Sequence, residues 1–353
     1  VSGSILPALE KLAAFVEGEY REKAPDRVGL WQYPGGREYY RLLVRYHTTM
    51  DLTPQQVHQT GLQEVARIEA QQAEIRQELG FEGSRAEFHH FLKTDRRFFP
   101  KTPQEVEERL EGYGHKMAEQ LGRLFGKIPD APWEVRRLDP QLEASMTFGY
   151  YQMPTPQEPH GIYFYNGSDL DQRSWISFES LAYHELLPGH HFQISLQTRN
   201  PDLPSIRQEF FATAFSEGWA EYAASLGFEA GLYQNPYDRY GRLAAELFLA
   251  TRLVVDTGMN ALEWPRRKAA RYMRQRLLES DQQIHTETLR YSADIPGQAL
   301  GYKIGSIHFH RLREKARQTQ GGEFDLRGFH DALLGSGAMP LSVLEAHLER
   351  LLR

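Results

Sequence analysis

The sequence contains no cysteine among its 353 residues. Disulfide bonds and thiolate metal ligands are therefore excluded, and any zinc ion must be held by His, Asp or Glu. The net charge of −6 gives no basic surface of the kind that binds nucleic acid. No apolar run approaches the ~20 residues that a membrane-spanning helix needs, so we expect no membrane span.

The sequence also has no basic start followed by an apolar run, the pattern of a signal peptide. The chain begins at Val1 rather than at Met, so we expect an upstream segment. The cellular location of the protein is left open, with the cytoplasm preferred. Hydrophobic residues make up 41% and charged residues 25%, as in ordinary globular proteins. The length suffices for one large domain or two lobes, and the oligomeric state is left open.

Helical patterns dominate the chain. Thr53 to Gln56 and Thr102 to Glu105 have the sequence of capping boxes, each with proline at the first helical position. Patterned stretches follow both boxes and end near Gly80 and Gly126. Further helices are expected over residues 39–48, 204–226, 237–257, 265–278, 297–318, 326–334 and 341–352.

Three short segments between residues 133 and 166 differ from this pattern. They are rich in aromatic and branched residues and are separated by proline-rich stretches, which is typical of strands. The strands are expected at Trp133 to Leu138, Thr147 to Gln152 and Gly161 to Asn166. The sequence therefore predicts a mainly α fold with a small β-sheet.

The strongest chemical signal lies between Tyr183 and His191, where three histidines and a glutamate are concentrated. The familiar His-Glu-x-x-His motif places two zinc-binding histidines on one helix face, but here a proline interrupts it. On an unbroken helix, His190 would point ~240° away from His184, and His191 would lie ~10.5 Å along the axis. Neither histidine could then share a zinc ion with His184, so the pattern requires an interrupted helix.

Pro188 and Gly189 supply this interruption, because proline disrupts helical geometry and glycine tolerates almost any backbone angle. Looping out two residues restores the four-residue register between His184 and His190. Looping out three would select His191 instead, which is the second choice. With His190 as the ligand, His191 is expected to lie directly behind the ligands and to support them. Glu185 then lies beside the metal as the general base. The alternative is that these are ordinary histidines around a proline kink.

A catalytic zinc needs a third protein ligand. Glu217 and Glu221 lie four residues apart on one face of an aromatic-rich helix. Buried carboxylates are costly unless they are paired or bind metal. We therefore predict Glu217 as the third ligand, with Glu221 accepting a proton from a ligating imidazole. A solvated stripe is the alternative, and Glu209, two turns earlier, is the weaker candidate.

A later segment from Arg290 to Gly305 mixes small residues with polar ones. Tyr302 is placed to donate a hydrogen bond to the oxyanion formed when water attacks a carbonyl. Lys303 and Arg290 are reserves for this task or for gripping a substrate carboxylate. Taken alone, the segment fits ordinary helix packing better.

These motifs together resemble a known family. His-Glu-Leu-Leu-Pro-Gly-His-His, Ser-Glu-Gly-Trp-Ala-Glu-Tyr and Pro-Gly-Gln-Ala-Leu-Gly-Tyr-Lys-Ile-Gly are similar to motifs of the bacterial "domain of unknown function 885" family. The resemblance covers nearly the whole chain and implies a zinc-peptidase-like site at the C-terminal part of a longer architecture. The chain departs from the family at Asn260, where histidine is expected, so a role for that histidine is in doubt.

A wider likeness assigns roles. Dipeptidyl peptidase III has a motif one residue longer than the standard one, and its two histidines still bind one zinc. Thimet oligopeptidase, carboxypeptidase Taq and angiotensin-converting enzyme have a glutamate ligand on a following helix and a tyrosine on a late helix. Glu217 and Tyr302 match these positions. The likeness implies a helical, two-lobed zincin-like fold with a deep cleft, zinc helices at about 175–226 and a late helix at about 297–318.

We therefore expect residues 1–353 to form a single catalytic region that hydrolyses short peptides with Zn²⁺. The strand from Gly161 to Asn166 is expected to border the cleft and to pair with an extended peptide, with Asn166 contacting substrate. Two alternatives remain open, a zinc hydrolase of another amide or ester and an inactive cleft-type binding protein.

Overall fold

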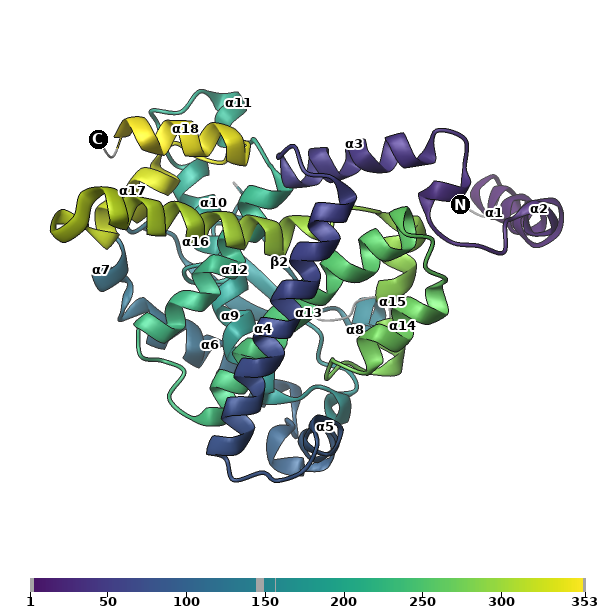
Figure 1. The fold of residues 1–353 in the computed structure, drawn as a ribbon, viewed down its shortest axis with the longest axis horizontal. Coiled ribbons are helices and arrows are strands. Elements are labelled where there is room, and N and C mark those ends of the chain that lie inside the picture. Colours follow the sequence, from purple (N-terminus) through teal and green to yellow (C-terminus); the bar gives the residue numbers. More distant parts are fainter. Residues whose placement is uncertain (1–2, 144–148, 156, 352–353) are drawn as a thin grey trace.

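Helices account for most of the structure, a computed structural model that describes residues 3–143, 149–155 and 157–351 (Figure 1). The expectation of a mainly helical fold with a small sheet is confirmed. In chain order the elements are α1 (Ile5–Phe15), α2 (Arg21–Lys23), α3 (Gly36–Thr48), α4 (Pro54–Glu78), α5 (Arg85–Thr94), α6 (Pro103–Ala118), α7 (Leu121–Leu124), β1 (Trp133–Arg137), α8 (Pro140–Glu143), β2 (Gly149–Gln152), β3 (Gly161–Tyr165), α9 (Phe178–Glu185), α10 (His190–Thr198), α11 (Ser205–Gln208), α12 (Thr213–Glu229), α13 (Pro236–Ala261), α14 (Arg266–Arg274), α15 (Asp281–Leu289), α16 (Leu300–Gln320), α17 (Leu326–Gly335) and α18 (Leu341–Leu351).

The helix starts follow the local sequence closely. At α4 the Thr53 hydroxyl accepts a hydrogen bond from the Gln56 amide (3.2 Å), and the Gln56 side chain accepts one from the Thr53 amide (2.8 Å), which completes the predicted capping box. At α6 only half of the box forms, because the Glu105 carboxylate accepts instead from the backbone amide of Lys101 (2.7 Å).

One predicted helix, over residues 204–226, is divided into α11 and α12. The break has a visible cause. The side-chain amide of Gln197 donates to the backbone carbonyls of Arg207, Gln208 and Phe210, at 3.0, 3.2 and 2.7 Å. These carbonyls therefore find a partner outside a helical ladder. Helices α1, α2, α5, α8 and α15 were not predicted from the sequence.

The small sheet has the order β1-β3-β2, with β1 parallel and β2 antiparallel to β3. The three strands lie where the sequence predicted them, although residues 147–148 of the second lie outside the described residues. The position of β3 corrects the prediction that residues 161–166 would pair with substrate. β3 is the central strand, so both of its backbone edges are already hydrogen-bonded.

The core consists of two large hydrophobic clusters and a smaller third one. The first joins the sheet to α6, α9, α12, α16 and α17, and the second joins α4, α5, α13 and α14. Helices α12 and α16 approach closely at Gly218 and Gly305, where a Cβ on Gly218 would lie 2.4 Å from the Gly305 Cα. The small residues of the late segment thus permit close backbone contact, and this contact brings Tyr302 toward the helix that carries Glu217.

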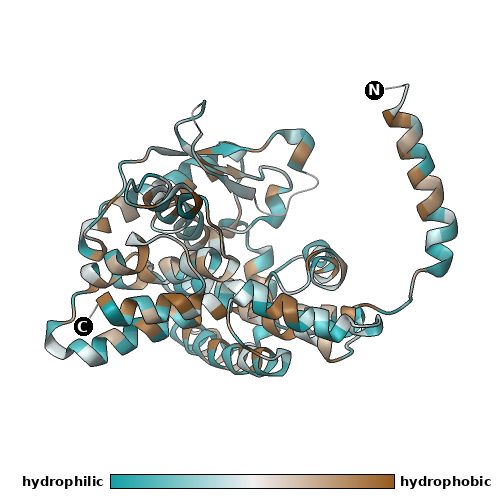
Figure 2. Cartoon of the chain, turned by 90° about the horizontal axis from the view of Figure 1, so that it is seen from above, coloured by the Kyte–Doolittle hydropathy of each residue, from teal (hydrophilic) through white to brown (hydrophobic). Residues whose placement is uncertain are grey.

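The N-terminal helix α1 stands apart from the remainder of the chain (Figure 2). None of its residues is buried, and its large apolar side chains are exposed. Within the described residues, no helix combines the length and apolar character that crossing a bilayer would require.

Candidate metal centre

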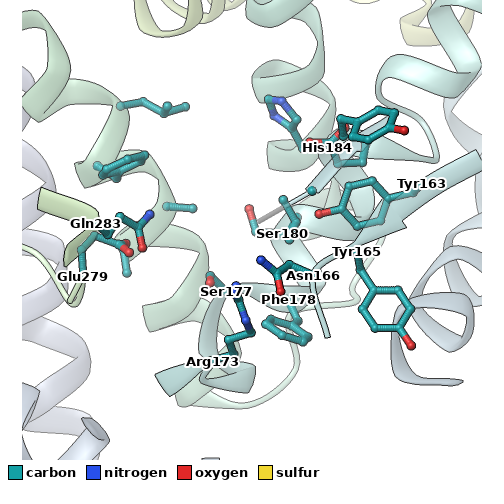
Figure 3. Close-up of a pocket in the computed structure, with 18 of the residues that line it drawn as sticks. Tyr163, Tyr165, Asn166, Arg173, Ser177, Phe178, Ser180, His184, Glu279 and Gln283 are labelled. Atoms are coloured by element: carbon teal, nitrogen blue, oxygen red, sulfur yellow. The ribbon is translucent and has the colours of Figure 1, made fainter. Parts of the chain in front are cut away.

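A cavity of about 620 Å³ lies between the two large clusters, since apolar side chains from both contribute to its wall. This volume is in the usual range of small-molecule sites. Figure 3 shows His184, Tyr163 and Asn166 on one wall of the cavity, with Glu279 and Gln283 on the facing wall. The predicted residues His184, Glu185, His190, Glu217 and Tyr302 all line this cavity.

The helix carrying the histidine motif is interrupted as the sequence predicted. α9 ends at Glu185 and α10 begins at His190, and the Leu187–Pro188 peptide bond between them is cis. Gly189 is required here by close packing, because a Cβ on it would lie 1.8 Å from the carbonyl oxygen of His184. The indole of Trp219 donates a hydrogen bond to the Pro188 carbonyl (2.9 Å), which ties the interruption to α12.

This break brings together the three residues predicted as ligands. The Nε2 atoms of His184 and His190 lie 3.7 and 3.1 Å from Oε2 of Glu217. One ligand atom from each of the three residues lies within 4.8 Å of the others. A zinc ion at ~2.1 Å from each of three ligands in tetrahedral geometry would separate them by about 3.4 Å, so the spacing suits a zinc site.

A buried atom without a partner strengthens this fit. Among the described residues, no donor is correctly oriented to hydrogen-bond Oε2 of Glu217, even though it is buried beside both imidazoles. An unsatisfied carboxylate oxygen in this position is costly unless a cation binds it. Burial opposes ionisation of Glu217, but the neighbouring His190 and His184 outweigh it and hold its pKa well below the ordinary value. The donor set is therefore two imidazoles and a carboxylate, which is a known set for catalytic zinc.

Glu185 lies beside these ligands on the last turn of α9. Burial raises the pKa of Glu185, and the negative charge of Glu217 raises it further, while His184 and His190 act in the opposite direction. A raised carboxyl pKa favours proton transfer near neutral pH. The geometry is thus compatible with the predicted general base.

Tyr302 lies on α16 beside the first histidine. Its ring stacks against that of His184 with centroids 6.2 Å apart, at an interplanar angle of 12°. On another side, the guanidinium of Arg252 lies 4.9 Å from the centroid of the Tyr302 ring. Burial and the charge of Glu217 raise the pKa of Tyr302 to about 12, so its hydroxyl stays protonated and can donate a hydrogen bond.

The structure assigns Glu221 a different role from the predicted one. Its carboxylate pairs with the Arg242 guanidinium at 2.8 Å, and both side chains are only 2% exposed. It therefore neutralises a buried cation and accepts no proton from a ligating imidazole. The prediction failed because Arg242 lies on α13, a partner that local spacing could not reveal.

His191, the second choice as ligand, is not part of the group that His184, His190 and Glu217 form among the described residues. Its Nδ1 lies 2.9 Å from the Tyr151 hydroxyl, and its Nε2 lies 3.1 Å from the Ala131 carbonyl oxygen. Burial lowers the pKa of His191 to about 4, so the ring is neutral. With both ring nitrogens occupied, His191 braces α10 against the sheet instead of supporting the ligands.

Of the three residues predicted to bind substrate, two line the cavity and one does not. Lys303 is outside the cavity lining and forms buried ion pairs with Glu246 (2.5 Å) and Glu64 (3.0 Å), so it is not available to substrate. Arg290 does line the cavity, where it donates to Gln298 at 2.8 Å. Asn166 also lines it.

The amide of Asn166 is engaged in shaping the chain after β3. Its Nδ2 donates to the Glu143 carbonyl (2.8 Å), and its Oδ1 accepts from the amide and hydroxyl of Ser168 (3.0 and 2.7 Å). Asn166 therefore stabilises a turn at the cavity wall, which accounts for its burial without contact to a substrate.

Three residues of the cavity escaped the sequence reasoning. The hydroxyl of Tyr163 is buried, lacks a hydrogen-bond partner among the described residues and points into the cavity (Figure 3). Arg252 supports Tyr302, and its signal was a charged residue inside an apolar helix. Glu279 has no such signal, because it precedes α15, a helix that was not predicted.

Asn260, where the family resemblance implied histidine, lies outside the cavity lining. Its side-chain amide nitrogen donates to the carbonyls of Asp256 and Tyr291 (3.0 and 2.8 Å), and its oxygen accepts from the Leu30 amide (3.1 Å). The residue joins α13 to distant parts of the chain and has a structural role.

Comparison with known proteins supports the predicted family. A family model described as "Bacterial protein of unknown function (DUF885)" matches residues 1–348. The chain is similar to the crystal structure of a "putative lipoprotein" from Colwellia psychrerythraea, with 34% identity and a TM-score of 0.95, over 99% of this chain and 61% of that one. It is also similar to a "putative lipoprotein of unknown function" from Shewanella oneidensis, with 20% identity and a TM-score of 0.78, over 98% of this chain and 64% of that one.

At 20% identity the second likeness shows the fold alone. The chain spans less than two thirds of the length of either solved relative. A comparison with the curated proteins finds no match. With a family model matching almost from end to end, the chain belongs to the bacterial family of unknown function DUF885.

Proposed function

We propose that this chain is a zinc-dependent peptidase that hydrolyses short peptides. The observation that carries the proposal is the convergence of two imidazole nitrogens and one carboxylate oxygen within 4.8 Å, in the wall of a cavity and next to Glu185. Two further features support it. One is the buried Glu217 oxygen, which lies beside both imidazoles but accepts no hydrogen bond from the described residues, and the other is the interrupted helix that sets the register of the histidines.

Five residues of the cavity have separate roles in this mechanism. His184, His190 and Glu217 would hold the zinc ion. A zinc ion bound there polarises a carbonyl and lowers the pKa of water, which are its two usual contributions to hydrolysis. Glu185 accepts a proton from the attacking water and passes it to the leaving amine. The hydroxyl of Tyr302 donates a hydrogen bond to the oxyanion as charge develops on the carbonyl oxygen.

The peptide itself is held in extended form along β2. This strand is at the edge of the described sheet, and Gly149, Tyr150 and Tyr151 from it line the cavity. An edge strand offers free backbone donors and acceptors to a peptide, whereas the central strand β3 does not. The cavity between two hydrophobic clusters also supports a two-lobed, zincin-like arrangement with a deep cleft.

The test is digestion of a fluorogenic peptide library with and without a chelator. We expect hydrolysis that the chelator abolishes and added zinc restores. A chain that binds zinc but cleaves only small esters or other amides would shift the proposal to a non-peptide hydrolase. A chain that binds peptides and cleaves nothing would be a binding protein.

A further inference from the structure

The cavity wall that faces the histidines carries a carboxylate for which the mechanism has no use. Glu279 lines the cavity and lies opposite His184 in Figure 3. Across the described parts of the chain, its carboxylate takes part in no hydrogen bond or ion pair. Lys93 donates to the backbone carbonyl of Glu279 instead (3.1 Å).

Three of the other acidic side chains of the cavity have basic neighbours, and the fourth, Glu185, is the proposed general base. Glu287 pairs with Arg252 at 3.0 Å, Glu221 pairs with Arg242 at 2.8 Å, and Glu217 lies against the two imidazoles. The charges of Glu287 and Glu221 are thus compensated within the protein, and Glu217 is assigned to the proposed metal. The charge of Glu279 faces the cavity without such compensation, so a bound molecule is left to provide it.

Gln283 adds a second, independent observation. Gln283 is only 9% exposed, and its side-chain amide nitrogen is buried without a hydrogen-bond partner among the described residues. The side chain points into the cavity next to Glu279 (Figure 3). The two residues lie on either side of Ser280. The Ser280 hydroxyl accepts a hydrogen bond from the backbone amide of Gln283 (3.2 Å), which fixes the start of α15. Their relative position is thus set by the helix cap.

We propose that Glu279 and Gln283 form a subsite that binds a positively charged group of the peptide substrate. The group is a free α-amino terminus or a basic side chain, both of which are ammonium or guanidinium donors that a carboxylate recognises. Gln283 hydrogen-bonds the carbonyl next to that group. The inference rests on the proposed function, because it assigns substrate chemistry to the same cavity.

The electrostatics of the wall agree with this assignment. Burial raises the pKa of Glu279 to about 7, and the neighbouring charge of Glu287 adds to the effect, while Lys93 and Arg252 oppose it. A carboxylate so poorly solvated gains more from a cation than an exposed one does. Perturbed carboxyl groups in a cavity are a common feature of functional sites.

The experiment measures peptide binding, so it does not depend on turnover. Glu185→Gln protein serves as the host, because it should hydrolyse the probes at least ~100-fold more slowly. Isothermal titration calorimetry compares three kinds of probe. The first is tetraalanine amide with a free amino terminus, the second is its N-acetylated form, and the third is the set of N-acetylated tetraalanine amides in which lysine replaces one alanine at a time. The same series is then titrated into hosts that also carry Glu279→Gln or Asp281→Asn.

Asp281→Asn is the matched control. It removes one negative charge two residues away, from a side chain that is 81% exposed and outside the cavity lining. Glu279→Gln removes no internal contact, so the fold should persist. Glu279→Lys is the second variant and should favour the same peptides with aspartate in place of lysine.

We expect one cationic probe to bind about 10- to 100-fold more tightly than the neutral acetylated peptide. That preference should disappear in Glu279→Gln and persist in Asp281→Asn. Preference for the free amine identifies an amino-terminal subsite, and preference for a lysine probe identifies a side-chain subsite. Equal binding of charged and neutral probes, or a preference that survives Glu279→Gln, overturns the inference.

The two proposals can fail separately. The unaltered protein could cleave no peptide while the Glu185→Gln host still shows a charge preference that depends on Glu279. That result would support the subsite and refute the peptidase proposal. Zinc-dependent cleavage of the probes without any charge preference would remove only the subsite.

Discussion

The buried ion pair of Glu221 and Arg242 tests whether Glu221 has a structural role or supports a histidine of the proposed metal centre. The Arg242 side chain is 2% exposed, and its Nε and Nη1 atoms have no hydrogen-bond partner among the described residues. Its cation is therefore held mainly by the carboxylate of Glu221, 2.8 Å away. Glu221→Gln removes that charge and leaves the buried arginine without its nearest counter-charge, with Glu246 as a remaining acidic neighbour. Breaking such a pair typically costs about 3–5 kcal/mol in free energy of unfolding.

The assay has two readouts. Denaturant unfolding of the chelator-treated protein measures stability without a contribution from metal binding. Competition with a chromophoric chelator measures zinc affinity. We expect a loss of about 3 kcal/mol or more in stability and nearly unchanged zinc affinity. The double variant Glu221→Gln/Arg242→Met should recover part of the stability, because it removes the stranded cation as well.

The opposite pattern would refute this reasoning. A residue that orients a metal-binding imidazole typically contributes 10- to 100-fold to metal affinity. If Glu221→Gln kept its stability and lost zinc affinity by at least about tenfold, Glu221 would act on a ligating histidine as the sequence first suggested.

Three further predictions follow from the cavity and from the buried groups around it. Glu185→Gln should bind zinc normally and hydrolyse peptides at least ~100-fold more slowly, as measured by single-turnover kinetics beside metal analysis. Tyr302→Phe should lower kcat by a factor of about 10²–10³ with little change in KM. Lys303→Met should instead lower the free energy of unfolding, because it breaks buried ion pairs. Burial raises the pKa of Asp256 to about 7, so between pH 4 and 7 the folded state holds a proton that the unfolded state has lost. The contribution of Asp256 to stability therefore falls as the pH rises through this window, by at most about 1.4 kcal/mol per pH unit. The free energy of unfolding should depend less on pH in Asp256→Asn, and an unchanged pH dependence would contradict the raised pKa.

Features set by neighbouring residues could be predicted from the sequence. The break between His184 and His190 follows from Pro188 and Gly189, whose backbone preferences act locally. The three strands were recognisable from their aromatic and branched residues. The convergence of Glu217 with the histidines was predictable because buried carboxylates need a partner.

Features set by distant partners could not be predicted in this way. Glu221 and Lys303 were assigned to the site because their own segments suggested it, but their partners Arg242 and Glu246 come from α13. The same limit applies to the sheet. β3 becomes the central strand only because β1 pairs with it in parallel, and strand order is a tertiary property that alternation does not encode.

The division of roles between the two adjacent histidines, His190 and His191, is the most direct test of the proposed metal centre. His190 lies 3.1 Å from Glu217, whereas both ring nitrogens of His191 are occupied by Tyr151 and Ala131. The measurement is zinc content by mass spectrometry after equilibration with a small excess of zinc and removal of free metal. Folding of each variant is checked by circular dichroism. The account predicts about one zinc per chain in the unaltered protein and in His191→Ala, and almost none in His190→Ala. Full zinc in His190→Ala beside a loss in His191→Ala, or no zinc in the unaltered protein, would contradict it.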